Sequence, residues 1–86
     1  MNKYQLSAPP PDIINYIKAP DRIDEEKFVS GLCNLIRQGM ANIEIEEWSF
    51  AGLSDIEDLI AESGYTIFFI PIAGMTAHAH FYLKKL

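Results

Sequence analysis

The chain of 86 residues is long enough for one small domain, and an apolar fraction of 49% excludes a disordered tail. A single cysteine, Cys33, excludes an internal disulfide and favours a reducing compartment, so we expect a cytoplasmic protein. The formal net charge is −5, and every charged side chain between Arg37 and Lys84 is acidic. This charge distribution disfavours direct binding to nucleic acid, because phosphates attract cations.

No segment is apolar enough to be expected in a membrane. Polar residues and the prolines at positions 9–11 interrupt the N-terminus, which lacks the apolar core of a signal peptide. The longest uninterrupted apolar run, residues 67–75, contains Pro71 and Gly74 and is far shorter than the roughly 20 residues that span a bilayer. These features predict a soluble protein with no membrane partner.

Residues 1–11 are predicted to form an extended N-terminal arm, because consecutive prolines lack N–H donors and favour polyproline geometry. Asp12 is then predicted to cap a short helix over residues 13–18. Pro20 would end this helix, since the residue before a proline is disfavoured in helical geometry.

A longer helix is predicted over residues 24–39, with Asp24 as its cap. Apolar residues recur there at helical spacing and would form one broad buried face. They are Phe28, Val29, Leu32, Cys33, Leu35, Ile36 and Met40. Gly39 occupies the position at which helices commonly end. A thiol on such a face is expected to act as a small core group and not as a nucleophile.

Residues 42–48 alternate between apolar and polar side chains, which is typical of a half-buried strand. Ile43 and Ile45 would face the core. The opposite face would carry Glu44, Glu46 and Trp48.

The segment Ser54-Asp55-Ile56-Glu57 matches a capping box, in which the Ser54 hydroxyl accepts from the Glu57 amide. It predicts a helix over residues 54–63 that ends at Gly64. The outer face of this helix would be acidic and would carry Asp55, Asp58 and Glu62.

The last third of the chain is predicted to form a β-hairpin. Two runs rich in β-branched and aromatic residues are separated by a short stretch that contains Gly74. In the second run one face, which we expect in the core, consists of Ala79, Phe81 and Leu83. The other face consists of His78, His80 and Tyr82.

In chain order these elements are helix, helix, strand, helix, strand and strand. They predict a single α+β domain over residues 1–86, with a three-stranded, mainly antiparallel sheet, a C-terminal β-hairpin and two to three helices packed on one face. The other sheet face would be too aromatic to be left to water unless the N-terminal arm covers it.

Two groups of side chains are candidates for binding a partner. The aromatic and histidine side chains of the second sheet face would meet another protein or a second copy of the chain, which predicts a homodimer through that face. The carboxylates would form a negative surface that attracts a basic partner. The candidate partner-binding residues are Trp48, His78, His80, Tyr82, Glu44, Glu46, Asp55, Asp58 and Glu62.

His78 and His80 lie two positions apart, so a strand would project both imidazoles from one face, as in some metal sites. A third ligand would have to come from Glu44 or Glu46, since the sequence has no other histidine. The alternative is that both histidines are ordinary surface residues of the sheet. The sequence contains no glycine-rich phosphate loop, Cys-x-x-Cys pair or recognisable Ser-His-Asp set, so we expect neither an enzyme nor a cofactor.

These features favour a small acidic protein-binding module that acts by contact, as an inhibitor, adaptor or antitoxin-like factor does. One form of this hypothesis is an inhibitor, encoded by a phage or mobile element, of a host enzyme that handles nucleic acid. The metal site described above would make the chain a small metal-binding protein, which is the less favoured alternative.

The other alternative is a winged-helix-like DNA-binding regulator, with residues 73–76 at the tip of the wing. Residues 54–63, which would enter the groove, carry four carboxylates and no cation, which weakens this alternative. It is weakened further because only one clear helix lies between the strand at 42–48 and the hairpin, where the motif has two.

Overall fold

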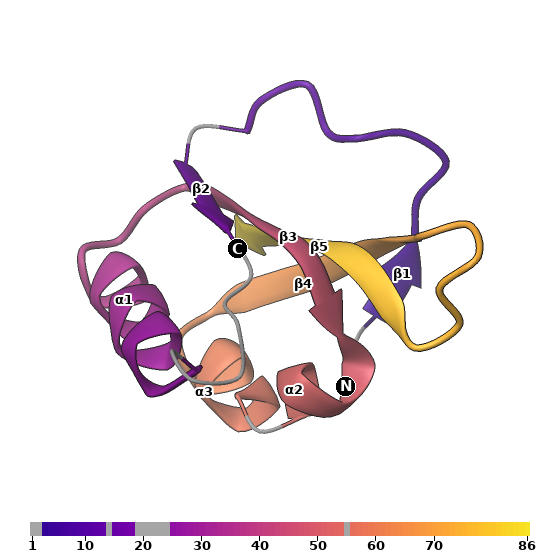
Figure 1. The fold of residues 1–86 in the computed structure, drawn as a ribbon. Helices are drawn as coiled ribbons and strands as arrows, with labels where there is room; N and C mark the ends of the chain where they lie inside the picture. Colours follow the sequence, from indigo (N-terminus) through magenta and orange to yellow (C-terminus); the bar gives the residue numbers. More distant parts are fainter. Residues whose placement is uncertain (1–2, 14, 19–24, 55) are drawn as a thin grey trace.

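In the part of the chain that the structure describes, a five-stranded mixed β-sheet carries the helices on one face (Figure 1). The computed structural model describes residues 3–13, 15–18, 25–54 and 56–86. In chain order the elements are β1 (Lys3–Gln5), β2 (Asn15–Lys18), α1 (Glu25–Arg37), β3 (Asn42–Ser49), α2 (Phe50–Ser54), α3 (Glu57–Glu62), β4 (Tyr65–Pro71) and β5 (His78–Lys85). None of the helices in these ranges is long and apolar enough to cross a membrane.

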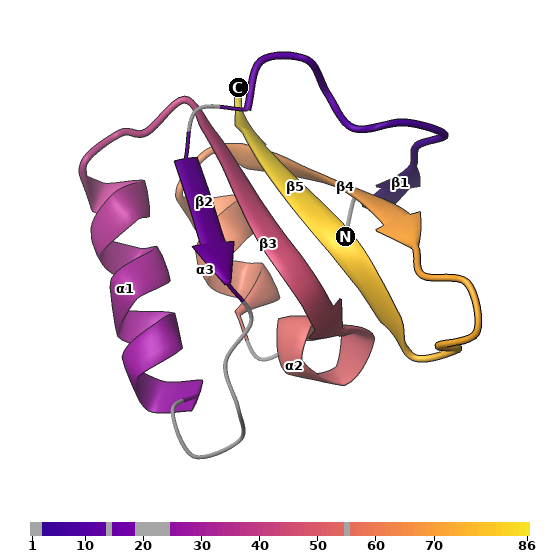
Figure 2. The same ribbon diagram turned by 45° about the horizontal axis from the view of Figure 1, so that its top comes forward.

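The strand order in the sheet is β1-β4-β5-β3-β2 (Figure 2). The central strand β5 pairs antiparallel with β4 and β3, whereas β1 and β2 are added in parallel at the two edges. The prediction of an α+β domain with a C-terminal hairpin is therefore confirmed. The predicted three-stranded sheet is wrong in its extent, because two N-terminal segments widen it to five strands.

The edge strand β2 takes the place of the short helix predicted for residues 13–18, so Asp12 precedes a strand and caps no helix. β2 pairs with β3 over four positions, from Asn15 opposite Ile43 to Lys18 opposite Glu46. A six-residue helix has little stability of its own, because helix nucleation is unfavourable. The edge of β3 supplies backbone hydrogen-bond partners for this segment without a nucleation step. Strand pairing is therefore more stable than the short helix that the sequence pattern predicts.

The helix predicted over residues 24–39 is present as α1 (Glu25–Arg37). Gly39 has a φ of 73°, and the N–H groups of Gly39 and Met40 donate to carbonyls of the last helical turn at 3.0 and 3.3 Å. This pair of bonds is a Schellman motif, which explains why the helix ends where the sequence predicts. The residues that α1 buries are Phe28, Leu32 and Ile36. The predicted cap, Asp24, lies outside the described residues.

A β-bulge in β3 turns Trp48 into the core, contrary to the prediction. The pairing of β3 with β5 shifts between Ile45 and Trp48, and Glu47 adopts the left-handed conformation with a φ of 48°. The extra residue interrupts the alternation, so Trp48 shares the face of Ile45 and not that of Glu46. The Trp48 side chain is 7% exposed and packs edge-on against Phe28, with the ring centroids 4.6 Å apart.

The helix α2 begins at a serine cap, Ser49, whose Oγ accepts a hydrogen bond from the Gly52 N–H at 2.9 Å. Ser54, predicted to cap the following helix, is the last residue of α2 and donates its hydroxyl back to the Ala51 carbonyl at 2.7 Å. α3 starts at Glu57 with no side-chain cap. The predicted capping box is therefore wrong, because Ser54 ends α2 and the residue that precedes α3 is Ile56.

The Ser49→Ala variant should lower the free energy of unfolding by about 1 kcal/mol, because the Gly52 N–H loses its acceptor. Ser54→Ala is the matched control and should change it by less than about 0.5 kcal/mol, since that hydroxyl is exposed. Urea denaturation followed by circular dichroism measures both variants. Equal effects at the two serines would contradict this assignment of the cap.

The β4–β5 hairpin supplies the centre of the core, as predicted. Gly74, with a φ of 82°, lies in the turn that connects the two strands. The residues of β5 that face the helices are Ala79, Phe81 and Leu83. From α2, Phe50 packs edge-on against Phe69 of β4 and Phe81 of β5, at centroid separations of 5.3 and 5.1 Å.

Candidate functional site

The arm between β1 and β2 crosses the sheet face that the helices leave open, which we call the open face (Figures 1 and 2). The two strands lie at opposite edges of the sheet, so the connection has to span β4, β5 and β3. Where the arm leaves β1, the Leu6 N–H donates to the Phe69 carbonyl at 2.8 Å. The half-buried positions of the arm are Leu6, Pro10 and Ile13. The arm therefore covers part of the open face.

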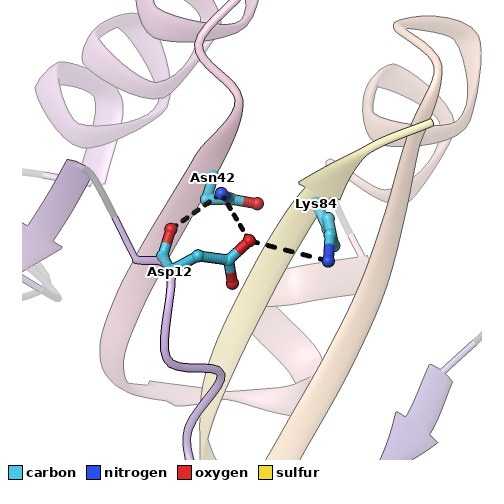
Figure 3. Close-up of polar contacts among 3 residues, drawn as sticks. All are labelled: Asp12, Asn42 and Lys84. Atoms are coloured by element: carbon cyan, nitrogen blue, oxygen red, sulfur yellow. Dashed lines mark hydrogen bonds and ion pairs between the residues drawn. The ribbon is translucent and has the colours of Figure 1, made fainter.

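Asp12 attaches the arm to the sheet through contacts with Asn42 of β3 and Lys84 of β5 (Figure 3). The Asn42 side-chain amide donates to the Asp12 backbone carbonyl at 2.7 Å and to Asp12 Oδ2 at 3.3 Å. Lys84 Nζ lies 3.7 Å from the same Oδ2, and Lys84 is the register partner of Asn42. Because the Asp12 and Lys84 side chains are about half exposed, we attribute the attachment mainly to the amide of the buried Asn42.

Tyr82 occupies the centre of the open face and is only 3% exposed. Burial raises the pKa of its hydroxyl, and the Glu44 carboxylate raises that pKa further through its charge and a hydrogen bond. His80 Nδ1 is buried and lies 3.9 Å from Glu44 Oε1. It has no hydrogen-bond partner in the described part of the chain. The middle of the open face is thus a polar cluster in which Tyr82 is buried, whereas the His80 and Glu44 side chains remain partly exposed.

Tyr16 lies at the outer end of the same row and is 55% exposed on the edge strand β2. It is the register partner of Glu44, and its hydroxyl donates to Glu46 Oε2. That hydrogen bond, partial burial and the charges of Glu46, Glu44 and Glu47 together raise the pKa of Tyr16 to about 12. Three carboxylates therefore act on one exposed aromatic ring.

The raised pKa of Tyr16 predicts a specific dependence on pH. An unfolded tyrosine has a pKa of about 10, so the folded chain holds this proton more tightly. The resulting stabilisation is fully present below about pH 10 and is lost as the pH rises from about 10 to about 12. Glu46→Gln removes the charged acceptor and should return the pKa toward 10.

The measurement is an NMR titration of ring-labelled tyrosine, with the Tyr16 signal assigned by its loss in Tyr16→Phe. The control is Glu62→Gln, which removes one charge from α3 and should leave the Tyr16 titration unchanged. A Tyr16 pKa near 10 in the unsubstituted chain would show that the carboxylates do not act on the ring.

The predicted partner-binding residues do not form one surface. Trp48 belongs to the core. The exposed Asp58 and Glu62 belong to α3, on the side of the sheet opposite Glu46, and Asp55 lies outside the described residues. The predicted residues at open-face positions are Glu44, Glu46, His78, His80 and Tyr82. The acidic residues are therefore divided between two sides of the molecule.

The hairpin also brings a lysine close to the start of the acidic strand β3. Lys84 of β5 is the register partner of Asn42, and its Nζ lies 3.7 Å from Asp12 Oδ2. This pairing could not be read from the sequence, because it depends on which strands become neighbours.

Sequence inspection missed Tyr16, Asp12 and Asn42 as members of the site. The helical prediction for residues 13–18 places Tyr16 beside an apolar helix face, and no local signal connects it with Glu46, which is 30 positions away. The segment 15–18 (Asn-Tyr-Ile-Lys) does not alternate between apolar and polar residues either, so it carries no clear strand signal. Ile17 is the residue of this strand that packs against the core, and Tyr16 lies on the other face.

The described residues bring no group of three or more histidine, cysteine or carboxylate side chains together in a way that could hold a metal ion. His80 approaches Glu44, but the register partner of His78 is Ser49. The chain matches no protein family, no curated protein and no solved structure with which it was compared.

Proposed function

We propose that the chain is a small protein-binding module, such as an inhibitor, adaptor or antitoxin-like factor, that acts by contact through the β2–β3 side of the open face. The observation that carries the proposal is the exposed ring of Tyr16 beside Glu44, Glu46 and Glu47. Tyrosine is enriched among the residues that dominate interface energies. Both the ring face and the carboxylates attract cations, so the arrangement suits a basic group on the partner.

The Tyr16 side chain is also held in place before any partner arrives. Its hydroxyl donates to Glu46, and its strand is paired with β3. A side chain that is already fixed loses less conformational entropy on binding than a mobile one. The ring therefore supports binding more effectively than its exposed area alone would suggest.

The test is photo-crosslinking in the native host with a benzophenone amino acid at position 16. We expect a discrete crosslinked protein, and we expect its yield to fall when Glu46→Gln is added, because the partner's cation loses its counter-charge. The matched control carries the crosslinker at Met75, an exposed position in the hairpin turn, and should not capture the same protein. Equal capture from both positions, or none from position 16, would contradict the proposed surface.

A second candidate is a winged-helix-like module, and one observation favours it. The segment between β3 and the β4–β5 hairpin contains two helices, α2 and α3, where the sequence indicated only one. However, α3 (Glu57–Glu62) carries no cation, and residues 72–77 at the hairpin tip are uncharged. Without these cations, such a module would contact a protein and not DNA. A salt-dependent gel shift with duplex DNA is the result that would favour DNA binding instead.

A further inference from the structure

The outer edge of β2 has no strand beside it within the described ranges, because the sheet order ends there. Alternate residues of an edge strand direct their N–H and C=O groups away from the neighbouring strand. β2 is short, with four residues, but β3 behind it runs for eight and holds β2 in fixed register. This edge is therefore a template for one more strand.

The side chains around this edge determine which side chains an added strand would have to carry. Tyr16 stands on the open face of β2, and its hydroxyl is directed to Glu46 of β3. Glu44 and Glu47 add negative charge around the same ring. These carboxylates favour a cationic side chain on an added strand.

We infer that the outer edge of β2 binds an extended, arginine-bearing segment of a partner protein by strand addition. This inference rests on the proposed protein-binding function and specifies its mode and its ligand. The added backbone pairs with the edge of β2, and an arginine side chain on the open face lies across the Tyr16 ring to reach the Glu46 carboxylate.

Arginine fits this position better than lysine. Its guanidinium is planar, stacks on aromatic rings and donates two parallel hydrogen bonds to a carboxylate. The arginine side chain is also long enough to reach across β2, which would lie about 5 Å from the added strand on one side and about 5 Å from β3 on the other. The partner residue next to Tyr16 is therefore the one that decides affinity.

A second copy of this chain is a poor occupant of the edge. Pairing β2 with β2 of another copy would bring two sets of Glu44, Glu46 and Glu47 to one junction, and like charges across such a contact are unfavourable. The charge around Tyr16 instead complements a basic segment.

The test titrates the isotope-labelled full chain with a synthetic nine-residue peptide in which arginine alternates with threonine, and follows backbone amide shifts by NMR. We expect saturable shifts in residues 15–18 and 43–47 that weaken with salt. Tyr16→Ala should weaken binding roughly tenfold and Glu46→Gln about fivefold. Glu62→Gln, an equal charge change on α3, should alter it less than about twofold. Circular dichroism confirms that each variant remains folded.

A matched peptide, N-methylated at alternate residues, keeps the arginines but cannot pair through its backbone and should not bind measurably. Equal binding of both peptides would overturn strand addition, while leaving charged contact at Tyr16 and the proposed function intact. Absence of binding by the arginine peptide, or shifts confined to β1 or α3, would also overturn the inference. The crosslinking experiment at position 16 tests the proposed function separately.

Discussion

The Phe81→Ala variant is expected to lower the free energy of unfolding by about 3–5 kcal/mol. Phe81 is 0% exposed on the central strand, between its register partners Ile45 and Phe69. It also packs edge-on against Phe50 of α2, so its removal leaves a cavity at the junction of the sheet and the helices. Chemical denaturation at constant pH measures the change.

The control for this prediction is Phe81→Leu, which keeps most of the apolar volume and should cost less than half as much. Thr76→Ala, in the exposed turn of the hairpin, should be nearly neutral. A loss below about 1 kcal/mol for Phe81→Ala would mean that the centre of the core lies elsewhere.

Gly52→Ala should destabilise the fold by about 1–3 kcal/mol, although alanine normally favours a helix over glycine. A Cβ at this position would lie 2.7 Å from Nε1 and 2.8 Å from Cε2 of the Trp48 indole. The indole cannot move away easily, because it is buried and packed against Phe28. The close approach of α2 to Trp48 therefore requires a residue without a side chain.

The matched control is Gly31→Ala in the middle of α1. A Cβ there meets nothing within 4 Å, so the substitution should stabilise the protein by about 0.5–1 kcal/mol through helix propensity alone. Thermal denaturation of both variants gives the comparison. Stabilisation by Gly52→Ala would show that the indole does not occupy this position.

The parts of the fold that depend on local sequence were predictable. The helix α1 follows from apolar spacing and Gly39, and the β4–β5 hairpin follows from two apolar runs around Gly74. The edge strand β2 was not predictable in the same way, because residues 13–18 show no alternation typical of a strand and form one only by pairing with β3. The secondary structure of such a short segment is decided by competition between local helical hydrogen bonds and pairing with a strand that is distant in the sequence.

The position of Trp48 in the core is indicated by a break in the alternation of β3. The inward residues of β3 are Ile43, Ile45 and Trp48, so the spacing changes from two to three at the adjacent Glu46 and Glu47. A strict alternation of two places Trp48 outside, whereas one inserted residue places it inside. A large aromatic residue at such a break indicates a bulge more readily than an exposed tryptophan.

The candidate site could be predicted only in part. The sequence identified Glu44, Glu46 and Tyr82 on one sheet face, because alternation along a single strand is a local property. It could not identify Tyr16 or Asp12, whose partners lie about 30 positions away. The central residue of the proposed contact was therefore visible only once the edge strand had been placed.

The two parallel edge strands also affect how the protein folds during synthesis. Lys3 pairs with Ile67 and Asn15 with Ile43, so both strands depend on residues that the ribosome adds much later. Contacts between such distant residues form slowly, because long loops have to close first. The residues of β1 and β2 are therefore synthesised before the strands with which they pair. Until those strands are made, chaperones, proteases or a partner have access to Tyr16 and the proline-rich arm.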